Sequence, residues 1–214
     1  MTKPAKTISF DKKDYFFLSA EKGNQLAFDL AVSINQKISE GKIKKPEIII
    51  GIARGALAWI KTLSDWLNIG EIATIQLVHY AGIGKRLAQP TILHSCLPRV
   101  DKKRVLLFDN VVETGETMEM ATEYLSMCGA EEIITASLYY KETSKIIPSL
   151  YSSTINAHTW IFFYFDMVES IKLLGSRWLT QGLSLEQIHR QFLEIGLPER
   201  ETITAMKILF NYSS

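Results

Sequence analysis

Residues 104–118 read RVLLFDNVVETGETM, and the interpretation of the whole chain starts from this stretch. The apolar run at 105–108 is continuous, which is typical of a strand buried on both faces of a parallel sheet. A polar pair, Asp109 and Asn110, follows this run, and after two valines comes the loop ETGET at 113–117. Beyond the loop, apolar residues recur at helical spacing. The stretch therefore predicts a buried strand, a polar loop and a helix, in that order.

The loop at 113–117 is a candidate anion site. It is expected at the carboxyl end of a strand and the amino end of a helix, where unpaired N–H groups and the helix dipole favour an anion. Gly115 permits close approach of the backbone, and the hydroxyls of Thr114 and Thr117 add donors. A sugar 5′-phosphate fits such a loop, with Asp109 and Asn110 taking the 2′ and 3′ hydroxyls of a ribose. The alternative interpretation is an ordinary turn in which a threonine caps the helix and Asp109 is solvated.

Composition limits the classes of protein to consider. The chain has 214 residues, of which 47% are hydrophobic and 22% charged, so it can form one sizeable domain with a small appendage. A net charge of +1 gives no basic field, so neither nucleic acid nor a membrane is expected as a partner. Two cysteines are too few for a disulfide framework, and the first residues lack the apolar core of a signal peptide. A cytoplasmic protein is expected.

Hydrophobic patterning elsewhere predicts strands alternating with helices. The expected strands are residues 47–51, 72–80, 105–108, 132–140 and 159–165, and the expected helices are residues 20–39, 57–67, 118–129, 185–195 and one that begins near 198. Ser184 and Gln187 form a capping box at the start of one helix. The chain is expected to open with a polar arm up to Ser19. Residues 81–98, with several Gly and Pro, are expected to form a long flexible loop that can contain a short extended piece.

This order of elements predicts an α/β fold with a doubly wound, mainly parallel sheet. We expect one domain at 1–167 and a helical segment at 168–214 packed on its core. Ligands of such sheets bind at the carboxyl ends of the strands. Four groups of polar or charged residues follow expected strands and should meet in one crevice: Arg54 with Gly55, residues 109–117, Lys141, and Trp160 and Ile161 with Asp166.

Residues 109–117, DNVVETGET, resemble the phosphoribosyl-pyrophosphate (PRPP) motif of the type I phosphoribosyltransferases. That motif has four hydrophobic residues, two acids, two hydrophobics, an acid or small residue, and then Thr-Gly-x-Thr. The resemblance extends over residues 46–166. Within the family the chain is most similar to the 6-oxopurine enzymes, which act on xanthine, hypoxanthine or guanine, because Thr159-Trp160-Ile161 and Asp166-Met167 resemble a segment of theirs. This implies an enzyme that transfers the phosphoribosyl group of PRPP to a purine.

The resemblance also implies roles for individual residues at the PRPP end of the site. The 5′-phosphate would be bound by Glu113, Thr114, Gly115, Glu116 and Thr117. Asp109 and Asn110 would hold the ribose hydroxyls and the Mg²⁺ cofactor, with Asp109 as the metal residue. Arg54 and Gly55 would bind pyrophosphate in a loop that often contains a cis peptide bond in this family. Taken alone, Arg54 fits a surface arginine beside a turn equally well.

At the base end, the resemblance implies that Lys141 donates to the 6-oxo group, which favours hypoxanthine, guanine or xanthine over adenine, because the exocyclic amine of adenine is itself a donor. Trp160, Ile161 and Asp166 would complete the base site. Glu113 would accept a proton near purine N7, and together with Asp109 it forms the expected catalytic pair. Before the resemblance is considered, a lysine leaving a strand into solvent is an equally good interpretation of Lys141.

The sequence departs from the family pattern at several positions. Glu113 stands where these enzymes have Asp, and Asn110 replaces the usual second acid. Two function classes therefore stay open. The first is the purine phosphoribosyltransferase, expected as a homodimer or homotetramer, with residues 81–98 as a mobile lid. The second is a PRPP- or nucleotide-binding regulator with the same fold and little turnover.

Overall fold

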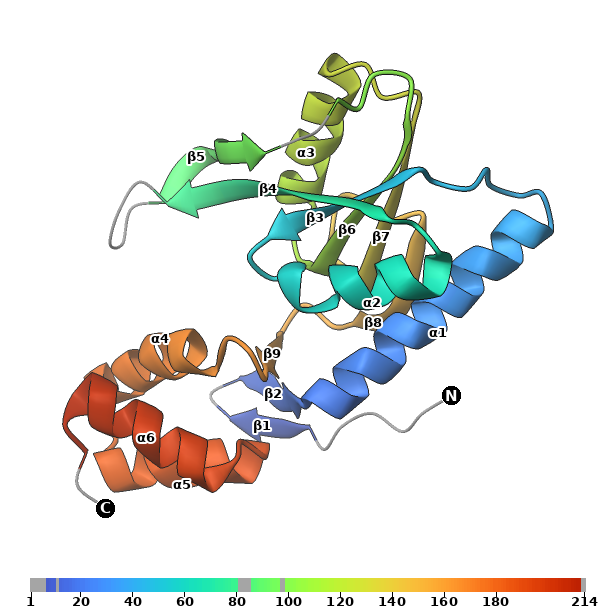
Figure 1. Ribbon diagram of the computed structural model, residues 1–214. Helices are drawn as coiled ribbons and strands as arrows, with labels where there is room; N and C mark the ends of the chain where they lie inside the picture. The colour runs from blue at the N-terminus through green and yellow to red at the C-terminus, as the bar shows by residue number, and fades with distance from the viewer. Residues whose placement is uncertain (1–6, 11, 81–85, 97–98, 213–214) are drawn as a thin grey trace. The chain divides into compact units, whose positions relative to one another are not determined.

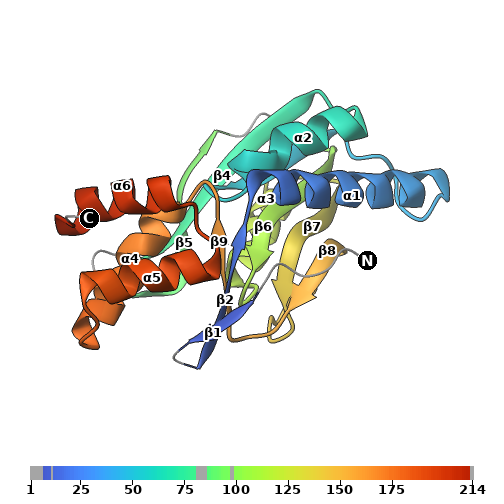
Figure 2. The same cartoon turned by 90° about the horizontal axis from the view of Figure 1, so that it is seen from below.

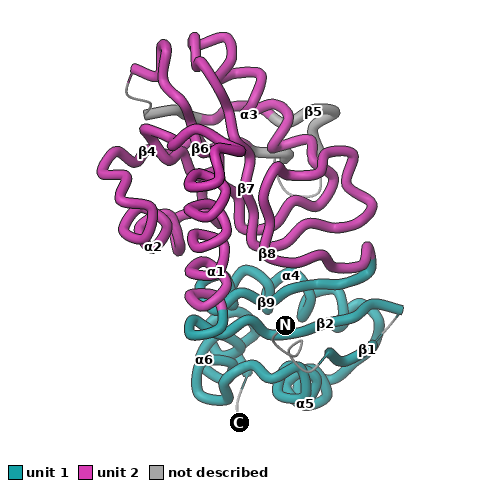
Figure 3. Tube along the Cα trace, turned by 90° about the vertical axis from the view of Figure 1, so that its right-hand side faces the viewer, with its two compact units in different colours: residues 1–22, 158–214 teal, residues 23–157 magenta. Residues whose placement is uncertain are grey.

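The computed structural model of the protein describes residues 7–10, 12–80, 86–96 and 99–212. They form two compact units, which Figure 3 shows in different colours. The larger unit consists of residues 23–157. The smaller unit joins residues 1–22 to residues 158–214.

The larger unit is built on a six-stranded sheet with the order β5-β4-β3-β6-β7-β8. All neighbouring strands are parallel except β4 and β5, which are antiparallel. The doubly wound, mainly parallel sheet is therefore confirmed. The strands are β3 (Ile48–Ala53), β4 (Glu71–Tyr80), β5 (Arg86–Cys96), β6 (Arg104–Val112), β7 (Glu132–Lys141) and β8 (Leu150–Ile155).

Helices cover both faces of this sheet: α1 (Ala20–Ser39), α2 (Leu57–Leu67) and α3 (Glu116–Met127). Figure 1 shows α3 on the opposite side of the sheet from α2. Alternate residues of β3 account for this arrangement, because Ile50 packs in a cluster with Met118 of α3, while Gly51 faces Ile60 of α2. A Cβ on Gly51 would lie 2.7 Å from Ile60 Cγ2, so the glycine permits close packing of α2 on the sheet.

The stretch 104–112 is the centre of the sheet. β6 pairs in parallel with β3 on one side and with β7 on the other. The apolar run 105–108 is fully buried. A strand with neighbours on both edges and helices on both faces has no solvated side, which explains why its apolar run is continuous. The predicted strand, loop and helix are confirmed.

The predicted polar arm up to Ser19 is wrong. β1 (Ile8–Phe10) and β2 (Lys13–Leu18) form an antiparallel pair, and β2 pairs in parallel with β9 (Thr159–Phe163). Charged residues flank this short segment, so its few apolar side chains do not form a recognisable strand pattern in the sequence. Two of these side chains, Tyr15 and Leu18, are fully buried. The strand predicted at 159–165 thus exists, but its hydrogen-bonded neighbour is the amino-terminal segment and not the large sheet.

The loop predicted at 81–98, with at most a short extended piece, is wrong for the residues that the structure describes, because the extended part is a long strand. Residues 86–96 form β5, an edge strand paired with β4. In the sequence, Pro90 argues against a strand at this position. Proline is nevertheless tolerated on an edge strand, where one side of the backbone has no partner. The pairing of β4 with β5 also shifts register between Val78 and Tyr80, so β5 lacks the regular alternation of residues by which a strand is recognised in a sequence. Residues 81–85, which include the predicted lid residue Lys85, lie outside the described part of the chain.

The smaller unit combines β1, β2 and β9 with three helices, α4 (Met167–Thr180), α5 (Leu185–Ile195) and α6 (Glu199–Phe210). Figure 2 shows these helices gathered together. Their core contains Trp178 and Phe192, packed with Tyr15 and Phe162 of the strands. The predicted capping box of α5 is confirmed, because Ser184 Oγ accepts from the backbone N–H of Gln187, and Gln187 Oε1 accepts from the backbone N–H of Ser184. The division at residue 168 stays a prediction.

Among the described residues, no helix is both long and apolar enough to span a membrane.

Candidate active site

The loop at 113–117 connects β6 to α3, as predicted. Gly115 has a φ of 90°, a left-handed conformation that glycine adopts without strain, and it immediately precedes the helix. Thr114 and Thr117 are half-buried at the amino end of this 12-residue helix. The N–H of Glu116 donates to Thr114 Oγ1 at 3.4 Å, so this hydroxyl also supports the turn itself. The helix dipole makes the position favourable for an anion.

A second segment, which sequence reasoning missed, holds this loop in place. Residues 142–149 connect β7 to β8, and the N–H of Lys145 donates to the carbonyl oxygen of Thr114 at 3.1 Å. A Cβ on Gly115 would lie 2.9 Å from Ser144 Oγ and 3.0 Å from the backbone nitrogen of Ile146. Ser144 Oγ in turn bonds both backbone groups of Ile146. Gly115 is thus required by the chain's own packing, whatever the loop binds.

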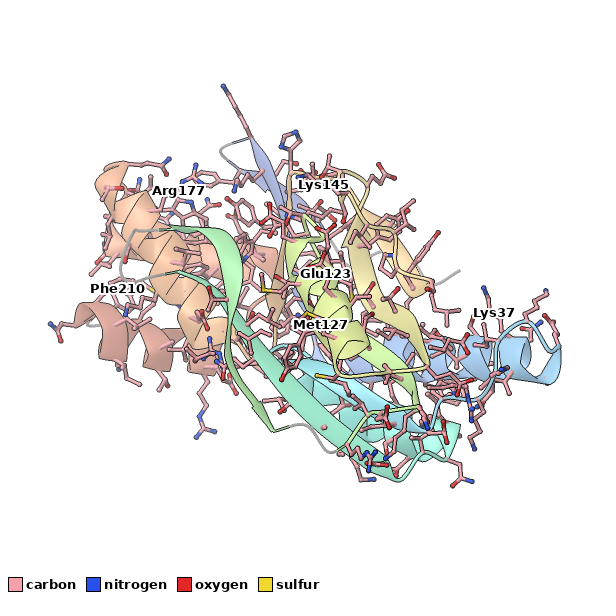
Figure 4. The ribbon with its side chains drawn as sticks, turned by 90° about the horizontal axis from the view of Figure 1, so that it is seen from above. Lys37, Glu123, Met127, Lys145, Arg177 and Phe210 are labelled. Atoms are coloured by element: carbon pink, nitrogen blue, oxygen red, sulfur yellow. The ribbon has the colours of Figure 1, made fainter. Side chains whose placement is uncertain are left out.

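The only local signal for this segment is its group of Ser and Thr residues with one Pro, which predicts a turn but not its partner. Lys145, labelled in Figure 4, has an exposed side chain. The segment therefore brings the backbone of Lys145, whose cationic side chain is exposed, to the predicted phosphate loop.

Asp109 lies within β6, which continues to Val112 and so does not end at the polar pair. Burial raises the pKa of Asp109 to about 7. A hydrogen bond from the N–H of Asn110 to Asp109 Oδ1, 2.8 Å long, partly opposes this rise. Near neutral pH the carboxyl group is therefore poised between its neutral and charged forms, and a cation beside it would favour the charged form.

The predicted ribose and pyrophosphate residues lie in direct contact. Asn110 is buried, with only 8% of its surface exposed, and its side chain packs against Gly55. A Cβ on Gly55 would lie 2.0 Å from Asn110 Oδ1. The bond between Ala53 and Arg54 is cis, as the resemblance implied, and Arg54 is exposed. The loop after β3 therefore packs against the polar pair on β6.

Lys141 and Glu113 form an ion pair in which Lys141 Nζ donates to Glu113 Oε1. The lysine side chain is 9% exposed and that of the glutamate 61%. The interpretation of Lys141 as a solvated lysine is thus wrong. A buried lysine normally needs such a partner. The pair places cationic N–H donors beside a carboxylate acceptor at the carboxyl end of β7, a combination that suits a heterocycle with a carbonyl and an N–H group.

The described residues hold no cluster of three or more His, Cys, Asp or Glu side chains that could bind a metal unaided. Asp109 offers one carboxylate, and it directly precedes Asn110, which packs against Gly55 in the loop that carries Arg54. Mg²⁺ is commonly held by one or two carboxylates together with substrate phosphates. These residues therefore fit a Mg²⁺ ion that arrives with a diphosphate ligand.

The remaining predicted base-site residues, Trp160, Ile161 and Asp166, belong to the smaller unit. Trp160 and Ile161 lie on β9, and Asp166 directly precedes α4. The ammonium group of Lys13 lies 5.9 Å from the centroid of the Trp160 ring. Ile161 is buried. Their contact with a base stays a prediction.

Comparison with known proteins identifies relatives of the larger part of the chain. The family model described as phosphoribosyl transferase domain matches residues 18–169. A ribose-phosphate pyrophosphokinase of Pyrococcus furiosus is 28% identical over 113 residues, which are 52% of this chain but only 35% of that relative. A xanthine-guanine phosphoribosyltransferase of Cereibacter sphaeroides is 25% identical over 121 residues, 56% of this chain and 68% of the relative.

Solved structures agree with this relationship. The chain superposes on a purine phosphoribosyltransferase from Pyrococcus horikoshii with a TM-score of 0.59 and 29% identity, covering 70% of this chain and 91% of that one. A xanthine-guanine-hypoxanthine phosphoribosyltransferase of Helicobacter pylori gives a TM-score of 0.59 over 77% of this chain and 99% of that one. At 19% identity, this second match concerns the fold alone.

Proposed function

The chain belongs to the phosphoribosyl transferase domain family, and from this premise we propose that it transfers the phosphoribosyl group of PRPP to N9 of a 6-oxopurine. The products would be a nucleoside 5′-monophosphate and pyrophosphate, as in purine salvage. The observation that carries the proposal is the ion pair between Lys141 and Glu113, next to the predicted phosphate loop. It offers the donor and the acceptor that a 6-oxopurine requires.

PRPP binding would use the groups around the loop at 113–117. Backbone N–H groups at the start of α3 and the hydroxyls of Thr114 and Thr117 would bind the 5′-phosphate. Asp109 would accept hydrogen bonds from ribose hydroxyls, and Arg54 would bind the leaving pyrophosphate. Mg²⁺, when bound, would neutralise charge on the pyrophosphate as the bond to C1′ breaks.

Base recognition would use the ion pair. An ammonium group has three donors, so Lys141 can bond Glu113 and the 6-oxo group of a purine at the same time. As N9 forms its bond to C1′, the electron pair of the breaking bond leaves with pyrophosphate. Glu113 would then accept the proton from N7, a role that its exposed carboxylate can fill.

Trp160, Ile161 and Asp166 are the further base contacts that the resemblance implies. Ile161 would cover one face of the purine, and the backbone of Trp160 would lie near the base edge. Asp166, just before α4, completes this set.

We also propose a cytoplasmic homodimer or homotetramer, as is common in the family; light scattering of the purified protein would give its mass in solution.

A second candidate function is a PRPP- or nucleotide-binding regulator. The observation that favours it is the replacement of the second acid by Asn110, whose side chain is buried against Gly55. The two candidates differ in turnover.

Purified protein should be incubated with PRPP, Mg²⁺ and, in turn, hypoxanthine, guanine, xanthine and adenine, with chromatographic detection of nucleotides. Product with a 6-oxopurine supports the transferase. PRPP binding without product from any base supports the regulator. A parallel incubation with ribose 5-phosphate and ATP tests the pyrophosphokinase chemistry named for the Pyrococcus furiosus relative.

A further inference from the structure

The side chain of Asn110 is buried but makes no hydrogen bond to any residue that the structure describes. Its backbone N–H donates to Asp109 Oδ1. Buried amides in proteins are normally paired, and leaving one unpaired costs stability. Such an amide points to a partner that arrives from outside the chain.

The position of the amide indicates which part of a ligand it would meet. Measured from the site of a Cβ on Gly55, Asn110 Oδ1, Cγ and Nδ2 lie at 2.0, 2.6 and 3.0 Å. The whole carboxamide therefore covers Gly55, in the loop that also carries Arg54. That loop is the proposed pyrophosphate loop.

The chemistry of the side chain agrees with this position. A carboxylate only accepts hydrogen bonds, whereas the NH₂ group of asparagine offers two donors. A carboxylate at 110 would repel pyrophosphate, and it would also repel the charged form of its neighbour Asp109. A neutral donor avoids both penalties.

We propose that Asn110 is a pyrophosphate-binding residue, whose carboxamide N–H donates to an oxygen of the leaving pyrophosphate beside Gly55. This assignment rests on the proposed function for the identity of the ligand. It gives Asn110 a different task from the ribose and metal binding that the resemblance implied, because it uses the donor that an acid at this position would lack.

Calorimetric titration of the Asn110→Asp variant with three ligands tests this assignment. The variant keeps the side-chain shape, removes the donor and adds a charge. Pyrophosphate and PRPP should bind about ten- to a hundredfold more weakly than to the wild type, the range for loss of a hydrogen bond to a charged group. Ribose 5-phosphate, which lacks the pyrophosphate, should change by less than about threefold, on the order of the smallest such effects.

Asn24→Asp is the matched control, because it introduces the same charge at an exposed position on α1 in the same unit. It should bind all three ligands as the wild type does. Thermal unfolding without ligand checks the fold of both variants. If Asn110→Asp does not fold, Asn110→Ser replaces it; this smaller, neutral variant lacks the amide and should also weaken pyrophosphate binding more than ribose 5-phosphate binding.

Wild-type affinity of Asn110→Asp for pyrophosphate would overturn the assignment, and so would equal losses for pyrophosphate and ribose 5-phosphate. These titrations need no purine and no turnover. If pyrophosphate binding depends on Asn110 while no nucleotide forms, the assignment stands and the proposed function fails. If nucleotide forms and Asn110→Asp binds pyrophosphate normally, the function stands and the assignment fails.

Discussion

Gly55→Ala tests whether the contact between the β3 loop and β6 controls the site. The new Cβ would lie 2.0 Å from Asn110 Oδ1 and 2.6 Å from Cγ, far inside van der Waals distance. Because normal contact begins near 3.4 Å, the loop and the amide must separate by more than about 1 Å. Overpacking of this kind costs about 1–3 kcal/mol of stability. A displacement of about 1 Å near reacting groups can lower the rate by on the order of a hundredfold.

The assay for this variant combines thermal unfolding with steady-state kinetics against PRPP. We expect a fall in Tm of about 2–12 °C, since 1 kcal/mol corresponds to about 2–4 °C for a chain of this size. The value of kcat/KM should fall about a hundredfold. Gly70→Ala is the control, because a Cβ on Gly70 meets nothing within 4 Å and its backbone needs no left-handed conformation.

Adding Asn110→Ala to Gly55→Ala should recover stability, because it removes the clashing side chain, without restoring pyrophosphate affinity. A Gly55→Ala protein with wild-type Tm and kinetics would refute the reasoning, because the amide would then not lie over the glycine.

Three further predictions concern single side chains. Glu113→Gln should lower kcat far more than PRPP affinity, because it removes the proton acceptor; equal losses in both would mean that Glu113 only shapes the loop. Lys141→Met should raise KM for the base about tenfold or more with little change for PRPP, whereas Lys61→Met, at an exposed ion pair on α2, should change neither. Asp109 has a raised pKa, about 7, so the folded state binds its proton more tightly and stability falls as pH rises from about 4 to 7. Thermal unfolding across that range should show a smaller fall for Asp109→Asn, and an unchanged pH dependence would contradict the burial of this carboxyl group.

Local signals in the sequence were sufficient for the centre of the fold. A continuous apolar run followed by a polar loop predicts β6 and α3, because both depend on neighbouring residues in the chain. The capping box of α5 was predicted for the same reason. The edge strand β5 and the short strand β2 were missed, since pairing at a sheet edge tolerates proline, irregular register and charged neighbours.

The candidate site was predicted in its residues but not in its contacts. The sequence places Asn110 and Gly55 far apart, and only the pairing of β3 with β6 brings them together. Likewise, Lys141 reaches Glu113 through the pairing of β7 with β6. Such contacts depend on three-dimensional packing, which residue type and spacing do not encode locally.

Base competition with the wild-type protein tests the central claim most directly. Hypoxanthine, guanine, xanthine and adenine are supplied together at equal concentrations with PRPP and Mg²⁺, and the nucleotides formed are quantified. Lys141 offers only donors, so nucleotides of 6-oxopurines should form and adenosine monophosphate should not. Adenosine monophosphate as the main product, or no nucleotide from any base, would contradict the account.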